Sequence, residues 1–378
     1  MSIFPREIIE CILSRLPVKS VVRFRCVSKS WLKLISDLDF IKTHLEQANL
    51  SNDINIMLIS DHIIYSVENV DGNLFFDPHH PFETPIRVVK ILGSCNGLLC
   101  INSDKEVIWL WNPSTRERKK LPDISIEFSG SKISVSHGFG YDPITDDYKV
   151  VRVHSYDGAD NVRHSEAKVY SLALNLWKTV PNMPYECLSR TGKLLNGALH
   201  WLAIPWNALD QSILISSFDI GNEKFREMPL PKFKDGIVLM NVVAVLAGLI
   251  CIIHECRFHL EVWVMKNYGV RESWMMFFSI GQPIFNPSIR YLIPLYILKN
   301  GEILLNKDGE RLILYNPKDG RVRDICIRGF SNWHQMETYV GSLVTLNSKE
   351  SQENRRIGEV TYSLGLDSAF LSSHILIT

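Results

Sequence analysis

Hydrophobic residues follow two different spacings along this chain. Over residues 1–47 they recur every three or four positions, which predicts three or four α-helices of about ten residues each. Pro5 suits the first turn of a helix, the pair Leu16-Pro17 ends that helix, and Ser28 can cap a later one. We therefore expect a small helical unit. A unit of this size rarely supplies a complete core, so part of its apolar surface needs a cover.

From about residue 54 the period changes to two, which is typical of β-strands. Turn signals such as Asn112-Pro113 and Asp142-Pro143 separate the apolar runs, and no convincing long amphipathic helix interrupts them. The predicted strands are Val107–Trp111, Val150–Val153, Lys168–Ser171, Ala198–Leu202, Ile213–Phe218, Val242–Val245, Leu249–Ile253, Leu260–Met265, Glu302–Leu305 and Leu312–Tyr315. This part of the chain is predicted to be all-β.

An aromatic residue recurs at the end of one strand in each stretch of about 50 residues. The six markers are Tyr65, Trp111, Tyr170, Phe218, Trp263 and Tyr315, with spacings of 46, 59, 48, 45 and 52 residues. A glycine also precedes an apolar strand repeatedly, at Gly97, Gly197, Gly248 and Gly301. Such a period, with several strands in each unit, is typical of the blades of a β-propeller. We predict about six blades in a closed ring; a β-sandwich is the alternative.

Composition and charge narrow the choice of partner. Of 378 residues, 46% are hydrophobic and 10% aromatic, which excludes disorder as a description of the whole chain. Lys and Arg number 41 and so do Asp and Glu, which points to neither nucleic acid nor a membrane surface. Residues 1–36 alone carry seven basic and two acidic side chains, a net charge of +5. They offer no row of Arg, Asn and Gln for base edges, so we expect an acidic protein partner and no nucleic acid.

The cysteines and the apolar runs bear on the compartment. Eight cysteines are scattered without a CxxC pair, and charges stand where a signal peptide needs an apolar core. We expect a reducing, intracellular location, in the cytoplasm, the nucleus or both. The uncharged run Ile237–Ile253 is barely long enough to span a membrane and is rich in Val and Ile, which favours buried strands.

The helical part resembles an F-box. Two runs carry the resemblance: Pro5 to Ser20, and Val22 to Trp31. Phe4-Pro5 stands where the family commonly has Leu-Pro. The resemblance implies docking on a Skp-type adaptor, which connects the chain to a cullin scaffold. Carried over by position, the implied adaptor contacts are Pro5, Ile8, Ile9, Leu13, Leu16, Pro17, Val18 and Trp31, some of which must instead form the core of the unit.

The β region resembles the plant F-box-associated domain of the type-1 class, with its kelch-like propeller. Its recurring phrases are Gly93–Cys100, Trp111–Arg116, Gly138–Pro143, Gly197–Trp201 and Glu261–Met265. The implied domains are an F-box at 1–47, a propeller-like substrate-recognition domain at 54–346, and a polar tail at 347–378 that we expect to be disordered. The implied function is a non-catalytic substrate receptor of an SCF-type ubiquitin ligase, which captures a target protein for ubiquitination and degradation.

The widest marker spacing suggests where a target could bind. It contains two predicted long connections, Asp123–Ser136 and His154–Ala167, and loops held by rigid blades are suited to recognition. The candidate target-binding residues are His154, Tyr156, Asp157, Arg163, His164 and, on the loop Pro205–Asn207, Trp206.

Catalytic and metal-binding patterns are few. Gly93-Ser94-Cys95-Asn96-Gly97 fits a nucleophile elbow, but an apolar strand is predicted after it instead of a helix, which favours a structural turn. Cys251, His254, Cys256 and His259 have the spacing of metal ligands, but the alternation of a strand would turn some of them to opposite faces. We therefore expect no catalytic residue, no metal and no cofactor.

Two other functions stay open at this stage. A propeller enzyme or carbohydrate-binding protein could also carry an F-box, and a central cavity with convergent carboxylates would favour it. Relatives of this class include pollen self-incompatibility receptors whose target is a secreted ribonuclease, and no residue in the sequence separates that role from defence or development.

Overall fold

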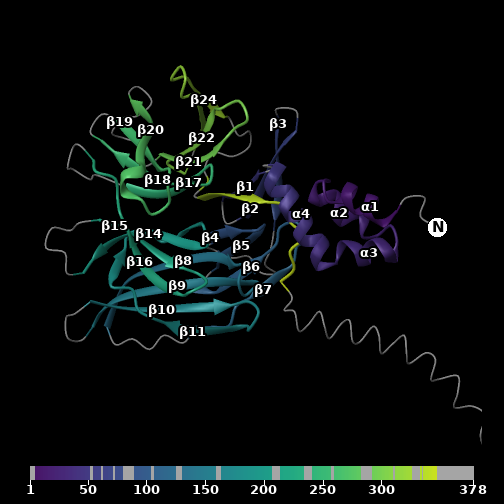
Figure 1. The fold of residues 1–378 in the computed structure, drawn as a ribbon, viewed down its shortest axis with the longest axis horizontal. Coiled ribbons are helices and arrows are strands. Elements are labelled where there is room, and N and C mark those ends of the chain that lie inside the picture. The colour runs from purple at the N-terminus through teal and green to yellow at the C-terminus, as the bar shows by residue number, and fades with distance from the viewer. Residues whose placement is uncertain are drawn as a thin grey trace, which may run out of the picture.

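A group of helices lies beside a ring of β-sheets in the computed structural model (Figure 1). The structure describes residues 5–51, 54–60, 63–70, 73–79, 89–103, 106–124, 130–158, 163–206, 213–233, 241–256, 259–281, 292–309, 311–325, 333 and 335–346. The predicted tail, 347–378, lies outside these residues.

Four α-helices occupy the described part of the N-terminal region. They are α1 (Arg6–Leu13), α2 (Val18–Phe24), α3 (Lys29–Ile35) and α4 (Leu38–Ser51). Pro5 and Pro17 stand at the N-caps of α1 and α2, and the backbone N–H of Trp31 donates to Ser28 Oγ at 3.2 Å to cap α3. The cap at Ser28 was therefore predicted correctly, and Pro5 stands one position before the first helical residue, Arg6. Helix α4 is longer than expected, at 14 residues, and leads directly to the first strand.

The described strands form six antiparallel sheets, which we call blades 1 to 6. Blade 1 contains β1 (Ile54–Ser60), β2 (Ile63–Val70), β3 (Asn73–His79) and β25 (Gln335–Val340); blade 2, β4 (Lys90–Cys95), β5 (Leu98–Asn102), β6 (Ile108–Trp111) and β7 (Arg118–Lys120); blade 3, β8 (Gly130–Asp142), β9 (Asp147–Gly158), β10 (Arg163–Ser171) and β11 (Leu176–Val180). Blade 4 contains β12 (Tyr185–Cys187), β13 (Lys193–Leu195), β14 (Ala198–Pro205), β15 (Leu214–Asp219) and β16 (Lys224–Met228); blade 5, β17 (Asn241–Leu246), β18 (Leu249–Glu255), β19 (His259–Met265) and β20 (Trp274–Gly281); blade 6, β21 (Leu292–Ile297), β22 (Ile303–Lys307), β23 (Arg311–Tyr315) and β24 (Val322–Ile325). A 3₁₀ turn, η2 (Arg271–Ser273), precedes β20. The prediction of a propeller with about six blades is confirmed, and the β-sandwich alternative is excluded.

The sequence repeat has a structural cause. Each aromatic marker lies on the third strand of its blade, so the six markers define the six blades. Each of the four repeated glycines stands just before the second strand of its blade, with φ between +72° and +86°. Glycine adopts these angles without the steric cost that a side chain imposes, which explains why it recurs there.

The apolar run Ile237–Ile253 supplies two of these strands. Residues 241–253 form β17 and most of β18, which pair with each other in blade 5, so buried strands were predicted correctly. Among the described residues, no helix combines the length and the apolar character that crossing a membrane requires.

The first and last strands of the propeller close the ring. Strand β25 pairs with β1 over six residue pairs, from Ile54 opposite Val340 to Ile59 opposite Gln335. The segment after β25 is then held by blade 2: the buried Asn112 side chain donates to the carbonyls of Ser342 at 3.1 Å and Val344 at 2.7 Å. Asn112 belongs to one of the recurring sequence phrases, and its contacts give that phrase a role in ring closure.

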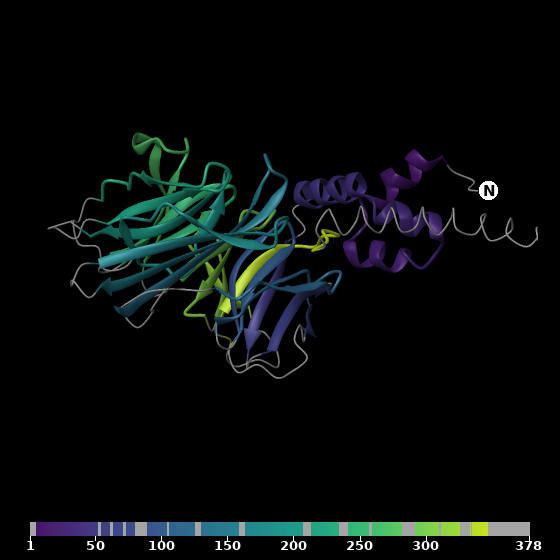
Figure 2. The same ribbon diagram turned by 90° about the horizontal axis from the view of Figure 1, so that it is seen from below.

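One apolar core joins the helices to the propeller. It contains Leu13, Ile35 and Ile41 from the helices, and it continues through Leu343 and Val344 into blades 2 and 3. On the surface, Lys42 of α4 forms an ion pair with Asp146 of blade 3 at 3.2 Å. The helices project from one side of the ring in both views (Figures 1 and 2).

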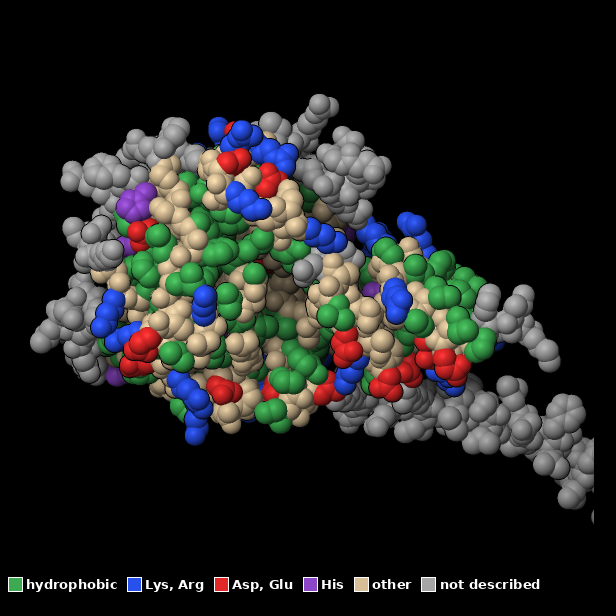
Figure 3. All heavy atoms as spheres, turned by 45° about the horizontal axis from the view of Figure 1, so that its top comes forward, with side chains coloured by type: hydrophobic (Ala, Val, Ile, Leu, Met, Phe, Trp, Pro, Cys, Tyr) green, Lys and Arg blue, Asp and Glu red, His purple; other side chains and the backbone are tan. Residues whose placement is uncertain are grey.

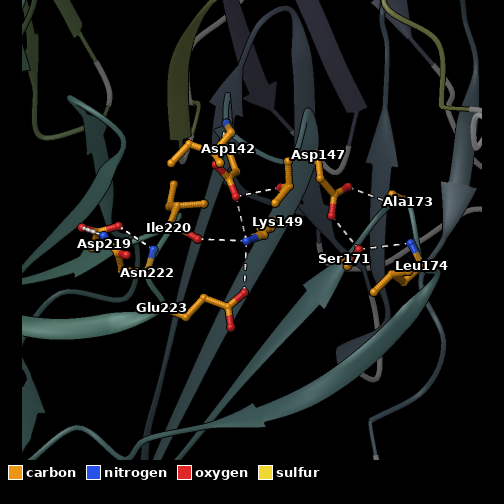
Figure 4. Close-up of polar contacts among 12 residues, drawn as sticks. Asp142, Asp147, Lys149, Ser171, Ala173, Leu174, Asp219, Ile220, Asn222 and Glu223 are labelled. Carbon is orange, nitrogen blue, oxygen red and sulfur yellow. Dashed lines mark hydrogen bonds and ion pairs between the residues drawn. The ribbon is translucent and has the colours of Figure 1, made fainter.

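A buried cation joins blades 3 and 4. Lys149 Nζ donates to Asp142 Oδ2, to the carbonyl of Ile220 and to Glu223 Oε1, each at 3.0 Å (Figure 4). Burial disfavours the charged lysine, but the two carboxylates outweigh that effect and raise the pKa of Lys149. Beside it, Asp147 accepts a hydrogen bond from Ser171 Oγ at 2.5 Å and another from the backbone N–H of Ala173 at 2.8 Å.

Blades 4 and 5 are linked through a buried histidine. His200 is fully buried; with Nδ1–H donating to the carbonyl of Lys193 at 3.0 Å, Nε2 accepts from the hydroxyl of Tyr268 at 2.6 Å. Burial lowers the pKa of His200 from 6.5 to about 4. The neutral ring is therefore the form that stabilises the fold.

The His200 ring predicts a loss of stability in acid. Protonation is more costly in the folded state, so the contribution of His200 is complete above about pH 6.5 and is lost as the pH falls toward 4. That loss is expected to reach about 3 kcal/mol in the free energy of unfolding. Urea unfolding between pH 7.5 and 4.5 measures it, and His200→Gln should flatten the dependence. Equal slopes for wild type and variant would contradict this assignment.

Candidate functional site

Several apolar side chains of the helical unit are exposed. They are Ile8 (45% exposed) and Ile12 (53%) on α1, Val27 (60%) just before α3, and Leu32 (46%) on α3. We call these four residues the helical apolar face. Ile8 and Ile12 are one helical turn apart, so they lie on the same side of α1. Apolar side chains gather at the end of the helical unit away from the propeller (Figure 3).

The predicted adaptor contacts divide between surface and core, as expected for this set. Pro5, Ile8 and Pro17 are exposed. Half-buried and packed against the shared core are Ile9, Leu16, Val18 and Trp31. Leu13 is only 2% exposed and lies inside that core, so its substitution would test folding and not docking.

Sequence reasoning missed three members of the helical apolar face. Ile12 was identified only as part of a helix, and Val27 and Leu32 were not singled out as surface residues. The spacing of Ile8 and Ile12 carries a signal for a common face, but helical spacing alone does not say which apolar side faces the core.

Positive charge accompanies this apolar surface. Basic side chains exposed on the first three helices and in the turn between α1 and α2 are Arg6, Arg15, Lys19, Arg23, Lys29 and Lys33. Arg6 pairs within α1 with Glu10, at 2.6 Å. An apolar patch with basic residues around it suits a partner that offers apolar and acidic groups together.

The predicted long connections are strands, so that part of the prediction was wrong. Most of His154–Ala167 belongs to the hairpin of β9 and β10, in which Tyr156 lies opposite His164 and Asp157 lies opposite Arg163. Ser131–Ser136 is part of β8, and residues 125–129 lie outside the described residues. Buried polar residues such as Ser155 and Ser165 interrupt the apolar alternation of these strands, which is why they were taken for loops.

The hairpin nevertheless brings several candidate target-binding residues together. Tyr156 and His164 stack with ring centres 5.5 Å apart, and Arg163 Nη1 lies 2.6 Å from Glu186 Oε2 of blade 4. Asp157 is exposed at the same end of the hairpin. This end points away from the helical unit (Figure 1).

Two of the candidates lie less openly. His154 is buried, so it is placed to support the hairpin and not to contact a partner. Trp206 follows β14 on the neighbouring blade 4 and is half-buried. The other four candidates lie together at the end of the β9–β10 hairpin, and we call Tyr156, Asp157, Arg163 and His164 the blade 3 tip. Asp157 and Arg163 are exposed, and Tyr156 and His164 are half-buried.

The possible nucleophile Cys95 is a structural residue. It ends β4, and the two-residue turn Asn96-Gly97 leads directly into β5. Burial raises the pKa of the Cys95 thiol to about 12, so it is not a reactive thiolate at neutral pH. The prediction of a structural turn is confirmed.

A cavity of about 750 Å³ lies between the helical unit and blades 1 and 6. Leu16 and His44 border it on the helical side, and Tyr296, Leu304 and Leu314 border it on the propeller side. Among the described residues that line it, none is Asp or Glu. The described lining therefore shows no pair of carboxylates like the one with which most glycoside hydrolases act.

Taken together, the fold defines a two-part binding protein: a helical unit with an apolar, basic surface, joined through a shared core to a six-bladed propeller. Comparison with known families specifies it further. Residues 1–43 match the F-box domain, and residues 46–346 match the F-box associated beta propeller domain. The chain therefore belongs to the F-box proteins with an F-box-associated propeller, and the resemblance seen in the sequence is confirmed.

Known relatives are similar over nearly their whole length. The chain is 31% identical to F-box protein CPR1 of Arabidopsis thaliana, with 91% of this chain and 89% of the relative covered. It is 30% identical to the F-box/kelch-repeat protein At3g23880 of the same plant, with 91% and 96% covered. F-box protein At3g07870, also from Arabidopsis thaliana, is 27% identical, with 90% and 91% covered.

Proposed function

We propose that this chain is the substrate-recognition subunit of an SCF-type E3 ubiquitin ligase. In this proposal, residues 1–47 dock on a Skp-type adaptor and through it on a cullin scaffold, and residues 54–346 capture a target protein. The chain itself catalyses no step: it holds the target near the ubiquitin-transfer machinery and so raises its effective concentration there. The proposed location is intracellular, in the cytoplasm, the nucleus or both.

The observation that carries this proposal is the helical apolar face. In the structure, Leu13, Ile35 and Ile41 are buried in the core shared with the propeller. The four residues of the helical apolar face remain exposed. Exposed apolar side chains of this size are costly in water and are typical of a protein interface. Their place on an F-box supports the adaptor as the partner.

The target would bind on the side of the propeller away from the adaptor. The blade 3 tip offers a cation, a carboxylate and a stacked aromatic pair, which suits a polar segment of a protein. A propeller enzyme is not favoured, because the family matches account for the two parts of the chain as an F-box and its associated propeller. The described lining of the cavity beside the helical unit also contains no Asp or Glu. No feature of the described residues selects a secreted ribonuclease as the target.

Replacing one residue of the helical apolar face tests adaptor docking. Ile12→Glu places a charge where the proposal needs apolar contact, and binding to a purified Skp-type adaptor should weaken by about 30-fold, the effect of losing about 2 kcal/mol at an interface centre. Ile12 is exposed, so the fold should be kept. Calorimetry measures binding, and circular dichroism measures folding.

Leu50→Glu is the matched control. Leu50 is an apolar residue on α4, 77% exposed and outside the helical apolar face. Its substitution should change adaptor affinity by less than about twofold, as expected for a residue outside the contact. Unchanged binding by a folded Ile12→Glu variant would overturn the docking surface. A variant that has lost docking should also retain its target in cells, because the captured target would no longer be passed to the ligase. The target could then be purified with the variant.

A further inference from the structure

The four residues of blade 5 with the spacing of metal ligands, Cys251, His254, Cys256 and His259, do not all lie on one face of their sheet. Cys251 faces the core between blades 5 and 6, together with Ile253 and Val262. His254 and Cys256 lie on the opposite face of that strand segment, because side chains alternate. The expected split of the four residues is thus confirmed, and Cys251 is separated from the others.

Glu261, instead of Cys251, lies close to Cys256 and His259. On the facing strand, His259 and Glu261 are two positions apart and share one face, and His254 lies directly opposite Glu261. The backbone N–H of Cys256 donates to the carbonyl of His259 at 2.9 Å, which sets these two residues side by side at the end of the hairpin. Ligand atoms of Cys256, His259 and Glu261 all lie within 4.8 Å of one another.

We propose that Cys256, His259 and Glu261 form a Zn²⁺ site at the end of the β18–β19 hairpin, with water as the fourth ligand. A thiolate, an imidazole and a carboxylate are a donor set that zinc accepts. One thiolate and one carboxylate also balance the two positive charges of the ion. Zinc bonds of about 2.0–2.2 Å separate neighbouring N and O ligands by about 3.3 Å, and His259 Nε2 lies 3.1 Å from Glu261 Oε1.

A second layer of contacts orients the carboxylate. Trp263 Nε1–H donates to Glu261 Oε2 at 2.8 Å, which leaves Oε1 directed toward His259. Metal ligands in proteins are commonly held by such outer contacts. Cys256 is buried, which limits competition by water.

The position of the site gives it a role. It lies at the turn between the second and third strands of blade 5, which is the position that the blade 3 tip occupies in its own blade. A bound ion would tie the two strands together at that end and hold the hairpin rigid. A role in target binding would rest on the proposed function, because it requires that this side of the propeller binds the target. The metal site itself does not depend on the proposed function.

Metal binding by the full-length chain tests the proposal. After removal of metal with a chelator, the protein is titrated with Zn²⁺ against a competing dye and with Co²⁺, whose absorption spectrum reports thiolate ligation. Wild type should bind one equivalent of each ion. Cys256→Ser should weaken Zn²⁺ binding on the order of 100-fold and abolish the thiolate band, and Trp263→Phe should weaken it on the order of tenfold.

Cys251→Ser is the matched control, because it removes a buried thiol from the same strand but from the opposite face. It should bind zinc as wild type does. Glu261→Gln keeps the shape of the side chain and serves if Cys256→Ser does not fold. No uptake by wild type, or equal affinity of folded Cys256→Ser and Cys251→Ser variants, would overturn the site. Neither result depends on adaptor binding, so the proposed function is tested separately.

Discussion

A chain that ends at Trp333 is expected not to form a stable propeller. The truncation removes β25, whose six residue pairs with β1 close the ring, and with it the segment that Asn112 holds. It also removes Leu343, Val344 and Leu346 from the core shared with the helices. The expected result is loss of cooperative unfolding and an exposed edge at β1, with aggregation as its consequence. Differential scanning calorimetry and size-exclusion chromatography measure both.

A chain that ends at Leu346 is the control. It lacks the predicted tail, 347–378, but keeps β25 and the backbone contact of Leu346 with Glu117 Oε2 at 2.9 Å. Its unfolding midpoint should stay within about 2 °C of that of the full chain, a shift that corresponds to less than about 1 kcal/mol at this size. If the chain that ends at Trp333 unfolds cooperatively at the same temperature as the full chain, ring closure by β25 does not stabilise the domain.

Replacing Lys149 by Met should lower the free energy of unfolding by about 3–5 kcal/mol, the usual cost of removing one partner from a buried ion pair. Asp142 and Glu223 would then face each other's charge without the cation, and the carbonyl of Ile220 would lose its donor. Lys149 has only 7% of its side chain exposed, so water cannot replace these contacts easily. Urea unfolding at pH 7 measures the effect.

Lys178→Met makes the matched comparison. Lys178 lies 2.7 Å from the other oxygen of Glu223, but 47% of its side chain is exposed. Exposed ion pairs contribute about 0–1 kcal/mol, so this variant should be nearly as stable as wild type. Equal losses for the two variants would mean that burial of Lys149 is not what makes its contacts important.

The number of blades could be predicted because each blade repeats a local requirement. Tyr170 and Phe218, for example, are fully buried on the third strands of blades 3 and 4, where one blade packs against the next. Gly97 shows the same for a turn: besides its positive φ, an added Cβ would lie 2.5 Å from the carbonyl oxygen of Val340. The aromatic residue marks the same position in all six blades, and a glycine with positive φ marks a turn in four of them, so the sequence alone displays the repeat.

Features that depend on distant segments could not be predicted. The shared core combines Leu13 of α1 with Leu343 and Val344 from the other end of the chain, so the local sequence does not show which side of α1 is buried. The hairpin of β9 and β10 was taken for a loop because polar residues such as His154 and Ser165 are buried by a neighbouring blade; Ser165 Oγ, for instance, donates to the carbonyl of Met183 at 2.6 Å. Glu261 joins Cys256 only through the register of two strands.

Pairing between β1 and β25 also imposes an order on biosynthesis. About 275 residues lie between Ser60 at the end of β1 and Gln335 at the start of β25, so at 5–20 residues per second the ribosome needs roughly 14–55 seconds to reach the second strand after the first. During that time the nascent chain carries an F-box that lacks part of its core and a β1 edge without its partner. Products of premature termination would keep this β1 edge unpaired, so they are expected to associate through it instead of forming a complete propeller.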